Sequence, residues 1–391
     1  MEYLTVSVVA FAATMAVTAI LHRAAPAIGF VDYPGGRKSH QDATPVVGGL
    51  AILLGVATVL AIGAFFNSTI SGAVAGLYDL KGFLIAAAIL TIVGAIDDRW
   101  GIRASIKLAI QLACCTMAVI VDGTVVGPIG VHLGGVEIAI AGELVAPFTI
   151  LVIVTIVNAI NLVDGIDGLA GGLTFVACLV MAKAVMTAEF ASDGVLLAAI
   201  LGGLAAFLAV NFPFRKRSRA WVFLGDAGSL LIGFTLAYLA VQLSNLPGRV
   251  FRPSTALWFF FIPVTDIVWL YLRRLWFGRA PFAPGRDHIH HLLMRRFSAR
   301  TTTWILVGFT AATAIAAYAA ERLGVHKGII LGAWVAAFLS YGPITHRGWK
   351  AAWLRSRRAE RKLRPAAEPV AEGAMPKVLG AARRPSGAAS E

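Results

Sequence analysis

One run of the sequence, residues 158–172, concentrates the side chains best suited to bind a metal ion. It reads NAINLVDGIDGLAGG and places Asn158, Asn161 and Asp164 three residues apart. If the run ends a helix, this spacing puts the three side chains in one stripe on its last turns. Amide and carboxylate oxygens are the ligands that Mg²⁺ prefers. A packing stripe of amides is the alternative, but the two Asp-Gly pairs, at Asp164 and Asp167, favour a ligand site.

Two adjacent carboxylates form a second candidate. Asp97 and Asp98 close one apolar run, and Lys107 is expected about two and a half turns into the next span. Carboxylates beside hydrocarbon are costly unless they bind a cation or receive protons. Acids at a membrane edge are also common without a function, so the pair gains weight only together with the other segments.

A third candidate is the run FLGDAGS at residues 223–229. Asp226 stands beside glycines at the start of an apolar run, where it could be a simple N-cap. The flanking glycines instead allow a ligand to approach closely. Phe223, just before the expected helix, could stack on a nucleotide base.

The loop at residues 32–49 combines basic side chains with a Gly-rich start of an apolar run. Lys38 lies in this loop. Backbone N–H groups at a helix start and a lysine can converge on a phosphate. An ordinary basic membrane loop is the alternative.

The last candidate segment, residues 281–292, carries Arg286, His288, His290 and His291. Three histidines so close together look like a metal site. The lack of cysteine there argues against zinc. An arginine with imidazoles fits a grip on phosphate or sugar oxygens better.

Membrane-spanning helices must hold these segments in place. Of the 391 residues, 58% are hydrophobic and 14% charged, against roughly 25% charged in soluble domains. Apolar runs of about 17 to 21 residues can each cross a hydrocarbon core as a helix. We therefore predict an all-α polytopic membrane protein with about eleven spans. The spans are centred near Val9, Leu54, Ile89, Ala113, Val152, Leu179, Leu204, Gly233, Phe261, Ala311 and Ala336.

The distribution of basic residues orients these spans. His22 and Arg23 follow the first span, which predicts a retained anchor with the N-terminus outside. An odd number of spans then puts the C-terminus in the cytoplasm and every motif on the cytoplasmic face. Residues 122–143 are expected to form an outside β-hairpin or re-entrant excursion. Asp266, near the middle of the ninth span, is expected to make structural hydrogen bonds.

Two regions follow from this layout. Residues 1–346 are predicted to form a single transmembrane catalytic domain, and residues 347–391 a basic, disordered cytoplasmic tail near anionic headgroups. The tail contributes much of the net charge of +13, so no nucleic-acid partner is implied. The three cysteines all lie in apolar runs and are expected to be packing residues.

Taken together, the motifs resemble the polyprenyl-phosphate N-acetylhexosamine-1-phosphate transferases, the superfamily of WecA-type enzymes and MraY-type translocases. The resemblance runs from about Asp32 to about Met294, and the form RDHIHH is similar to the WecA branch. It implies transfer of a sugar-1-phosphate from a UDP-N-acetylhexosamine to polyprenyl (undecaprenyl) phosphate, with release of UMP. The implied cofactor is Mg²⁺, with Mn²⁺ as an alternative, and the implied location is the bacterial inner membrane.

The resemblance also implies roles for individual residues. The metal ligands are Asp226 and Asn161, the acids handling the lipid phosphate are Asp97 and Asp98, the diphosphate lysine is Lys107, the uracil contacts are Asp167 and Phe223, and the sugar-phosphate grip is Arg286 with His288, His290 and His291. The catalytic candidates are thus Asp97, Asp98, Asp164 and His290, and Lys38 joins the substrate-binding set. The donor sugar is expected to be GlcNAc, while GalNAc, QuiNAc, FucNAc and MurNAc-pentapeptide donors and a homodimer stay open.

Two rival functions use similar residues. A secondary transporter also places acids and histidines near a membrane, but usually at the midplane and in two repeated halves. Here only Asp266 is mid-span, and no internal repeat is evident. A CDP-alcohol phosphotransferase would continue Asp-Gly-x-x-Ala-Arg, which neither Asp164-Gly165 nor Asp167-Gly168 does.

Overall fold

The computed structural model describes residues 2–34, 42–66, 68–77, 79–127, 131–133, 136–138, 140, 142–186, 191–214, 219–245, 250–278, 280 and 288–363. The chain divides into two compact units, Met1–His346 and Arg347–Glu391, and the first carries the site. The helices are α1 (Glu2–Ile28), α2 (Gly48–Phe66), α3 (Ser68–Leu77), α4 (Lys81–Trp100), α5 (Ala104–Asp122), α6 (Gly142–Val163), α7 (Leu169–Val185), α8 (Ala191–Asn211), α9 (Gly225–Asn245), α10 (Pro253–Phe259), α11 (Phe261–Trp276), α12 (Ile289–Leu293), α13 (Ala299–Arg322) and α14 (Lys327–Leu363). The strands are β1 (Val31–Asp32), β2 (Thr44–Pro45), β3 (Val131–Leu133) and β4 (Val136–Ile138).

The predicted class, an all-α polytopic membrane protein, is confirmed. Within the described residues, eight helices are long and apolar enough to cross a membrane, or nine if the bent pair α10–α11 counts as one span. The two other predicted spans coincide with α4, which carries several charges, and with α7, which has 17 residues. The count of eleven spans and the sidedness of the termini remain predictions.

The predicted ninth span is broken rather than continuous. α10 and α11 meet at an angle of 83° next to Phe260. The cause is Pro263 in the first turn of α11, since proline has no N–H to bond the carbonyl four residues earlier and its ring clashes there. The break gives α11 its own direction, and α11 carries Asp266.

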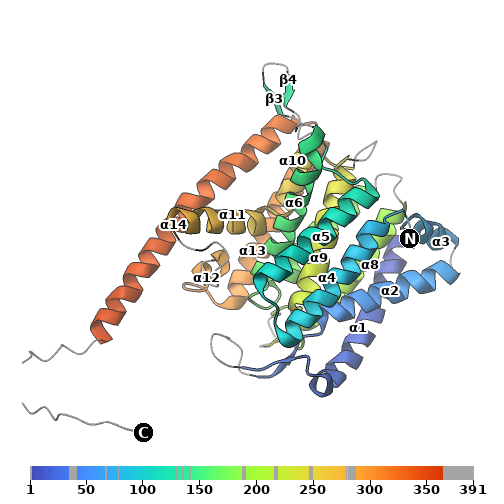
Figure 1. The fold of residues 1–391 in the computed structure, drawn as a ribbon, viewed down its shortest axis with the longest axis horizontal. Coiled ribbons are helices and arrows are strands. Elements are labelled where there is room, and N and C mark those ends of the chain that lie inside the picture. The colour runs from blue at the N-terminus through green and yellow to red at the C-terminus, as the bar shows by residue number, and fades with distance from the viewer. Residues whose placement is uncertain are drawn as a thin grey trace, which may run out of the picture. The chain divides into compact units, whose positions relative to one another are not determined.

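Helix α9 is the centre of the bundle. Of its apolar stretch 94% is buried, against 17% for residues 327–346 of α14. It packs against α2, α4, α6, α7 and α10, and Figure 1 shows α4 and α6 alongside it. Gly49 of α2 and Gly94 of α4 lie against the backbone of residues 226–228, where a Cβ would clash. These glycines let α2 and α4 approach the start of α9, so the end of α4 lies beside Asp226.

Two short antiparallel ladders complete the fold. β3 pairs with β4 within the segment predicted as a hairpin or excursion, which favours the hairpin. β1 pairs with β2 at the entry to α2, and Val46 bridges to Phe223. The backbone carbonyl of Phe223 accepts a hydrogen bond from Gly48 at 2.9 Å. The FLGDAGS run is thereby fixed to the start of α2.

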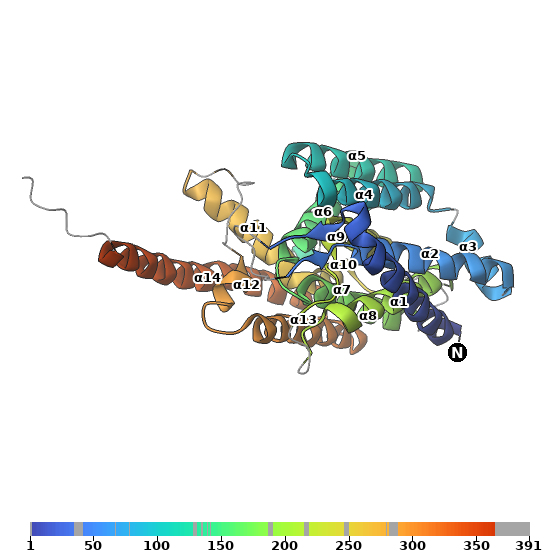
Figure 2. The same cartoon turned by 90° about the horizontal axis from the view of Figure 1, so that it is seen from below.

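Seen from below, α4 and α5 lie together along one edge of the bundle (Figure 2).

Part of the predicted disordered tail is helical. α14 continues beyond His346 to Leu363. Alanine, leucine, arginine and lysine, which favour helix, dominate residues 347–363, and Pro365 follows. Residues 364–391 lie outside the described part of the chain.

Candidate active site

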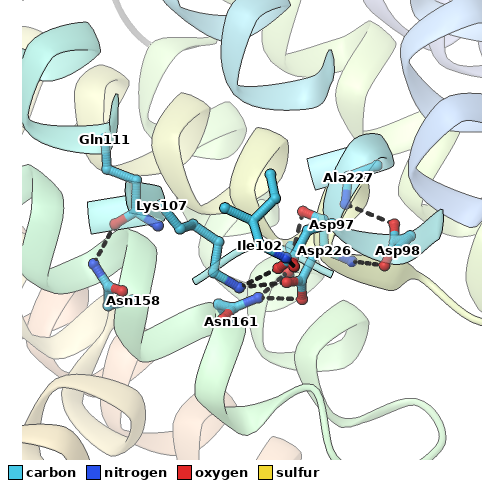
Figure 3. A network of polar contacts seen from close by, with 10 residues as sticks. Asp97, Asp98, Ile102, Lys107, Gln111, Asn158, Asn161, Asp226 and Ala227 are labelled. Carbon is cyan, nitrogen blue, oxygen red and sulfur yellow. Dashed lines mark hydrogen bonds and ion pairs between the residues drawn. The ribbon is translucent and has the colours of Figure 1, made fainter. Parts of the chain in front are cut away.

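A lysine ion-paired with two aspartates forms the centre of the site (Figure 3). Asp97 lies in the last turn of α4, Asp226 in the first turn of α9 and Lys107 in the first turn of α5. Lys107 Nζ is 2.6 Å from Asp97 Oδ2 and 2.5 Å from Asp226 Oδ2. All three side chains are less than a third exposed. The ammonium therefore supplies the counter-charge that lets two carboxylates lie close together.

The place of Lys107 in its helix differs from the prediction of about two and a half turns. Helix α5 begins only at Ala104, so Lys107 lies within its first turn. The reason is Gly101, which ends α4 with a φ of 75°, a conformation that favours glycine. The chain reverses direction immediately afterwards, and this brings Lys107 back to Asp97.

The predicted polar stripe on α6 divides between two tasks. Asn161 Nδ2 donates to Asp226 Oδ1 at 2.7 Å and to Ser229 Oγ at 2.8 Å. Asn158 Nδ2 instead donates to Gln111 Oε1 of α5 at 2.5 Å (Figure 3). Asn161 thus belongs to the site, whereas Asn158 ties α6 to α5.

Asp98 makes a different contact from its neighbour Asp97. Its Oδ1 accepts from the backbone N–H of Asp226 at 2.7 Å, and its Oδ2 from that of Ala227 at 3.0 Å. The first N–H groups of a helix have no partner within the helix. Asp98 therefore caps α9 from outside and fixes the residue that carries the Asp226 carboxylate.

A cavity of about 860 Å³ opens beside this cluster. Candidate site residues on its wall, within the described chain, are Asp98, Asp164, Asp167, Phe223, Asp226 and His291. Its volume is that of a pocket for a small-molecule ligand or cofactor. The polar cluster meets the cavity through Asp226 and Asp98, because Asp97, Lys107 and Asn161 are not on the described wall.

The turn between α6 and α7 supplies two of the wall carboxylates. Gly168 ends it with a φ of 73°, and its N–H donates to Asn211 Oδ1 at 2.7 Å. The Asp167 carbonyl accepts from Thr303 of α13 at 3.0 Å. Burial, together with the nearby carboxylates of Asp226 and others, raises the pKa of Asp164 well above its usual value. The turn is thus held by hydrogen bonds on two sides and carries an acid whose pKa is raised.

The three histidines lie at different depths from the cavity. His291 is on the cavity wall, while His288 and His290 are only 5% and 1% exposed. The rings of His288 and His290 are nearly parallel, with centroids 5.6 Å apart, and those of His290 and His291 are 4.2 Å apart. Only the last of the three predicted histidine contacts therefore faces the cavity directly.

Two predicted site residues cannot be placed. Lys38 and Arg286 lie outside the described residues, so their predicted phosphate contacts remain predictions. The structure also adds residues that the motifs did not single out. Asn211 joins the turn before α7 to Val222, next to Phe223, through its Nδ2 at 2.8 Å from the Val222 carbonyl. The only sequence signal for it is a lone amide at the end of an apolar run.

The chain is similar in sequence to known proteins of one enzyme family. The pattern of glycosyl transferase family 4 matches residues 80–244, which include the central cluster. The chain is 31% identical over 339 residues to an undecaprenyl-phosphate alpha-N-acetylglucosaminyl 1-phosphate transferase of Salmonella typhi, covering 86% of this chain and 89% of that one. The Escherichia coli (strain K12) protein of the same name is 32% identical over 344 residues, covering 88% and 90%. That of Pasteurella multocida (strain Pm70) is 31% identical over 351 residues, covering 86% and 91%.

Proposed function

The chain belongs to glycosyl transferase family 4, and from that membership we propose that it transfers N-acetylglucosamine-1-phosphate from UDP-N-acetylglucosamine to undecaprenyl phosphate. It is a sugar-1-phosphate transferase of the membrane. Family membership decides against the transporter and the CDP-alcohol phosphotransferase considered above. We place the enzyme in the bacterial cytoplasmic membrane, with its site on the cytoplasmic side.

The proposed reaction exchanges one phosphorus–oxygen bond for another. An oxygen of the lipid phosphate attacks the β-phosphorus of the donor, and the bond between that phosphorus and the oxygen bridging to the α-phosphorus breaks. The products are a sugar-diphospho-lipid and UMP. Such a transfer depends on charge neutralisation and in-line positioning more than on covalent help from the protein.

The observation that carries this proposal is the position of Asp226. Its carboxylate is held by Lys107 and Asn161 on one side, and it borders the cavity on the other. A diphosphate in the cavity would therefore lie beside Asp226, with the Lys107 ammonium directly behind that carboxylate. Moving that ammonium from carboxylate to phosphate oxygens would offset charge that develops during transfer.

The donor set fits a magnesium ion. The carboxylate oxygens of Asp97 and Asp226 already bind one cationic group, the Lys107 ammonium. Mg²⁺ is usually held by one or two carboxylates together with substrate phosphates. Asp226 and the amide oxygen of Asn161 would hold it here, and the ion would supply neutralisation of the phosphate oxygens.

The remaining candidates divide between the two substrates. We assign Asp167 and Phe223 to the uracil end of the cavity, and His291 with Arg286 to the sugar-phosphate end. The lipid phosphate is already anionic near neutral pH, so it needs orientation more than deprotonation. Asp98 can serve that step by holding Asp226 in place, which its two backbone contacts support.

Purified protein with Mg²⁺, undecaprenyl phosphate and a panel of UDP-sugars tests the proposal. The panel contains the GlcNAc, GalNAc, QuiNAc, FucNAc and MurNAc-pentapeptide donors, and UMP release is measured. We expect the highest kcat/KM with UDP-GlcNAc. Faster release with another donor would change the substrate, and no lipid-dependent UMP release with any donor would refute the function.

A further inference from the structure

Asp266 of α11 is a buried carboxylate with donors from two other elements. It is 5% exposed. Its Oδ2 lies 2.8 Å from His288 Nδ1, and its Oδ1 accepts from the Ile289 backbone N–H at 3.0 Å and from the Tyr341 hydroxyl at 2.6 Å. The prediction that Asp266 makes hydrogen bonds is confirmed. Burying a carboxylate is costly unless such bonds satisfy it, so this arrangement fixes all four groups together.

These contacts determine where α12 begins. His288 is its N-cap but makes no capping bond with its own side chain, and Ile289 is its first residue. A helix of five residues is too short to hold its conformation alone. Asp266 satisfies one of its free N–H groups and anchors the N-cap ring. Tyr341, on α14, donates to the same carboxylate oxygen as the Ile289 N–H.

The three histidine rings connect Asp266 to the cavity wall. His288 stacks on His290, and His290 contacts His291 on the cavity wall. His290 also lies against the turn that carries the wall carboxylates, since a Cβ at Gly165 would be 2.9 Å from its Nε2. Burial and the neighbouring imidazoles lower the pKa of His290 to about 3, so a neutral ring fills this space.

We propose that Asp266 and Tyr341 are positioning residues for the donor subsite, acting through His288 on the histidine layer and on the turn at residues 164–168. Neither residue is on the described cavity wall. A carboxylate partner fixes the orientation of an imidazole and which ring nitrogen carries the proton. The assignment to the donor subsite rests on the proposed function. The mechanical link, by which Asp266 acts through His288 on the turn at residues 164–168, does not.

The first test uses hydrogen exchange and needs no turnover. Asp266→Asn leaves an oxygen for Ile289 and Tyr341 but presents an amide nitrogen that cannot accept from His288. The control is Asp193→Asn, another aspartate that is 5% exposed, at the opposite end of α8 from Asn211. We expect faster amide exchange at residues 288–294 and 164–168 in Asp266→Asn only. Unchanged exchange there, or the same change in the control, would overturn the link.

The second test is kinetic. Loss of a hydrogen bond to a charged group typically costs about 10- to 100-fold, and we expect that fall in kcat/KM for UDP-GlcNAc with the KM for the lipid unchanged. Tyr341→Phe should give a smaller fall, about 3- to 10-fold. In a His288→Ala background, Asp266→Asn should add almost nothing, because both act through one contact.

The outcomes separate the two proposals. Wild-type protein that releases no UMP from UDP-GlcNAc refutes the proposed function, and the exchange test still decides the mechanical link. If the wild type is active, two results overturn the positioning role. One is that the losses of Asp266→Asn and His288→Ala multiply in the double variant, and the other is that Asp266→Asn raises the KM for the lipid as much as it impairs use of the donor.

Discussion

The carboxylate of Asp98 accepts a hydrogen bond from the backbone N–H of Asp226 at 2.7 Å. The two acids are 128 residues apart in the chain, and the contact joins the end of α4 to the start of α9. Asp97, the neighbour of Asp98, contacts the Asp226 side chain through Lys107 instead. Asp98 therefore fixes the backbone of Asp226, and Asp97 fixes its carboxylate through Lys107.

Removing the cap should lower stability and activity together. In Asp98→Ala the first N–H groups of α9 lose their acceptor, which costs about 1 to 2 kcal/mol, and Asp226 is no longer fixed. We expect a lower unfolding temperature and a loss of UMP release.

The chain offers a matched control. Asp122 likewise caps α4, accepting from the N–H groups of Gly82 and Phe83 at 2.8 Å each, and its Oδ2 also accepts from the Tyr238 hydroxyl at 2.9 Å. Asp122→Ala should lower the unfolding temperature at least as much but leave most of the activity. Equal loss of activity in both variants would mean that Asp98 matters only for folding.

Asp226→Asn should abolish transfer while the protein still inserts and folds. The substitution keeps the size of the side chain but removes the charge that we assign to the metal. A fall in UMP release of about 100-fold or more is expected, with an unfolding temperature close to that of the wild type. Turnover like that of the wild type would rule out the metal role.

Removing the metal ion with a chelator tests the same metal role. EDTA should stop UMP release by the wild-type protein, and added Mg²⁺ should restore it, with Mn²⁺ as a weaker substitute. We assign the ion only two protein ligands, Asp226 and Asn161, so the metal should be removable at millimolar chelator. Full activity after removal of all divalent cations would contradict the assignment.

His290 should make stability depend on pH. Its pKa is lowered from 6.5 to about 3 by burial and by the rings of His288 and His291. Between these values the unfolded chain binds a proton that the folded chain excludes. Stability is therefore full above pH about 6.5 and falls as the pH drops, by at most about 1.4 kcal/mol per unit.

Thermal unfolding followed by tryptophan fluorescence at pH 7.5 and 5 checks this. The fall in unfolding temperature should be smaller in His290→Gln than in the wild type. The exposed His326 provides a control, and His326→Gln should behave like the wild type. An undiminished fall in His290→Gln would show that other groups cause the pH dependence.

The sidedness of the site can be tested by cysteine labelling in intact cells. The three native cysteines are buried, which keeps the background low. A membrane-impermeant maleimide should label a cysteine placed at Asp79 and miss one placed at Arg286 until the cells are lysed. The reverse pattern would invert the topology and with it the functional interpretation.

Local patterns predicted the helices, and the family resemblance named the residues of the central cluster. Apolar runs locate the spans, and Asn161 and Asp226, which the resemblance groups together, are in contact. The break at Phe260 was missed, because Pro263 sits inside an apolar run whose length alone indicates a span. The contact of Asp266 with Tyr341 was also missed, since it joins residues 75 apart and depends on how α11 and α14 pack.

The most direct measurement follows the donor's β-phosphate. UDP-GlcNAc labelled with ³²P at that position is incubated with the enzyme, undecaprenyl phosphate and Mg²⁺, and the lipid and nucleotide products are separated. Transfer of a sugar-1-phosphate puts the label in the lipid and releases unlabelled UMP. Labelled UDP with an unlabelled sugar-lipid would contradict the account, because the sugar alone would then have been transferred.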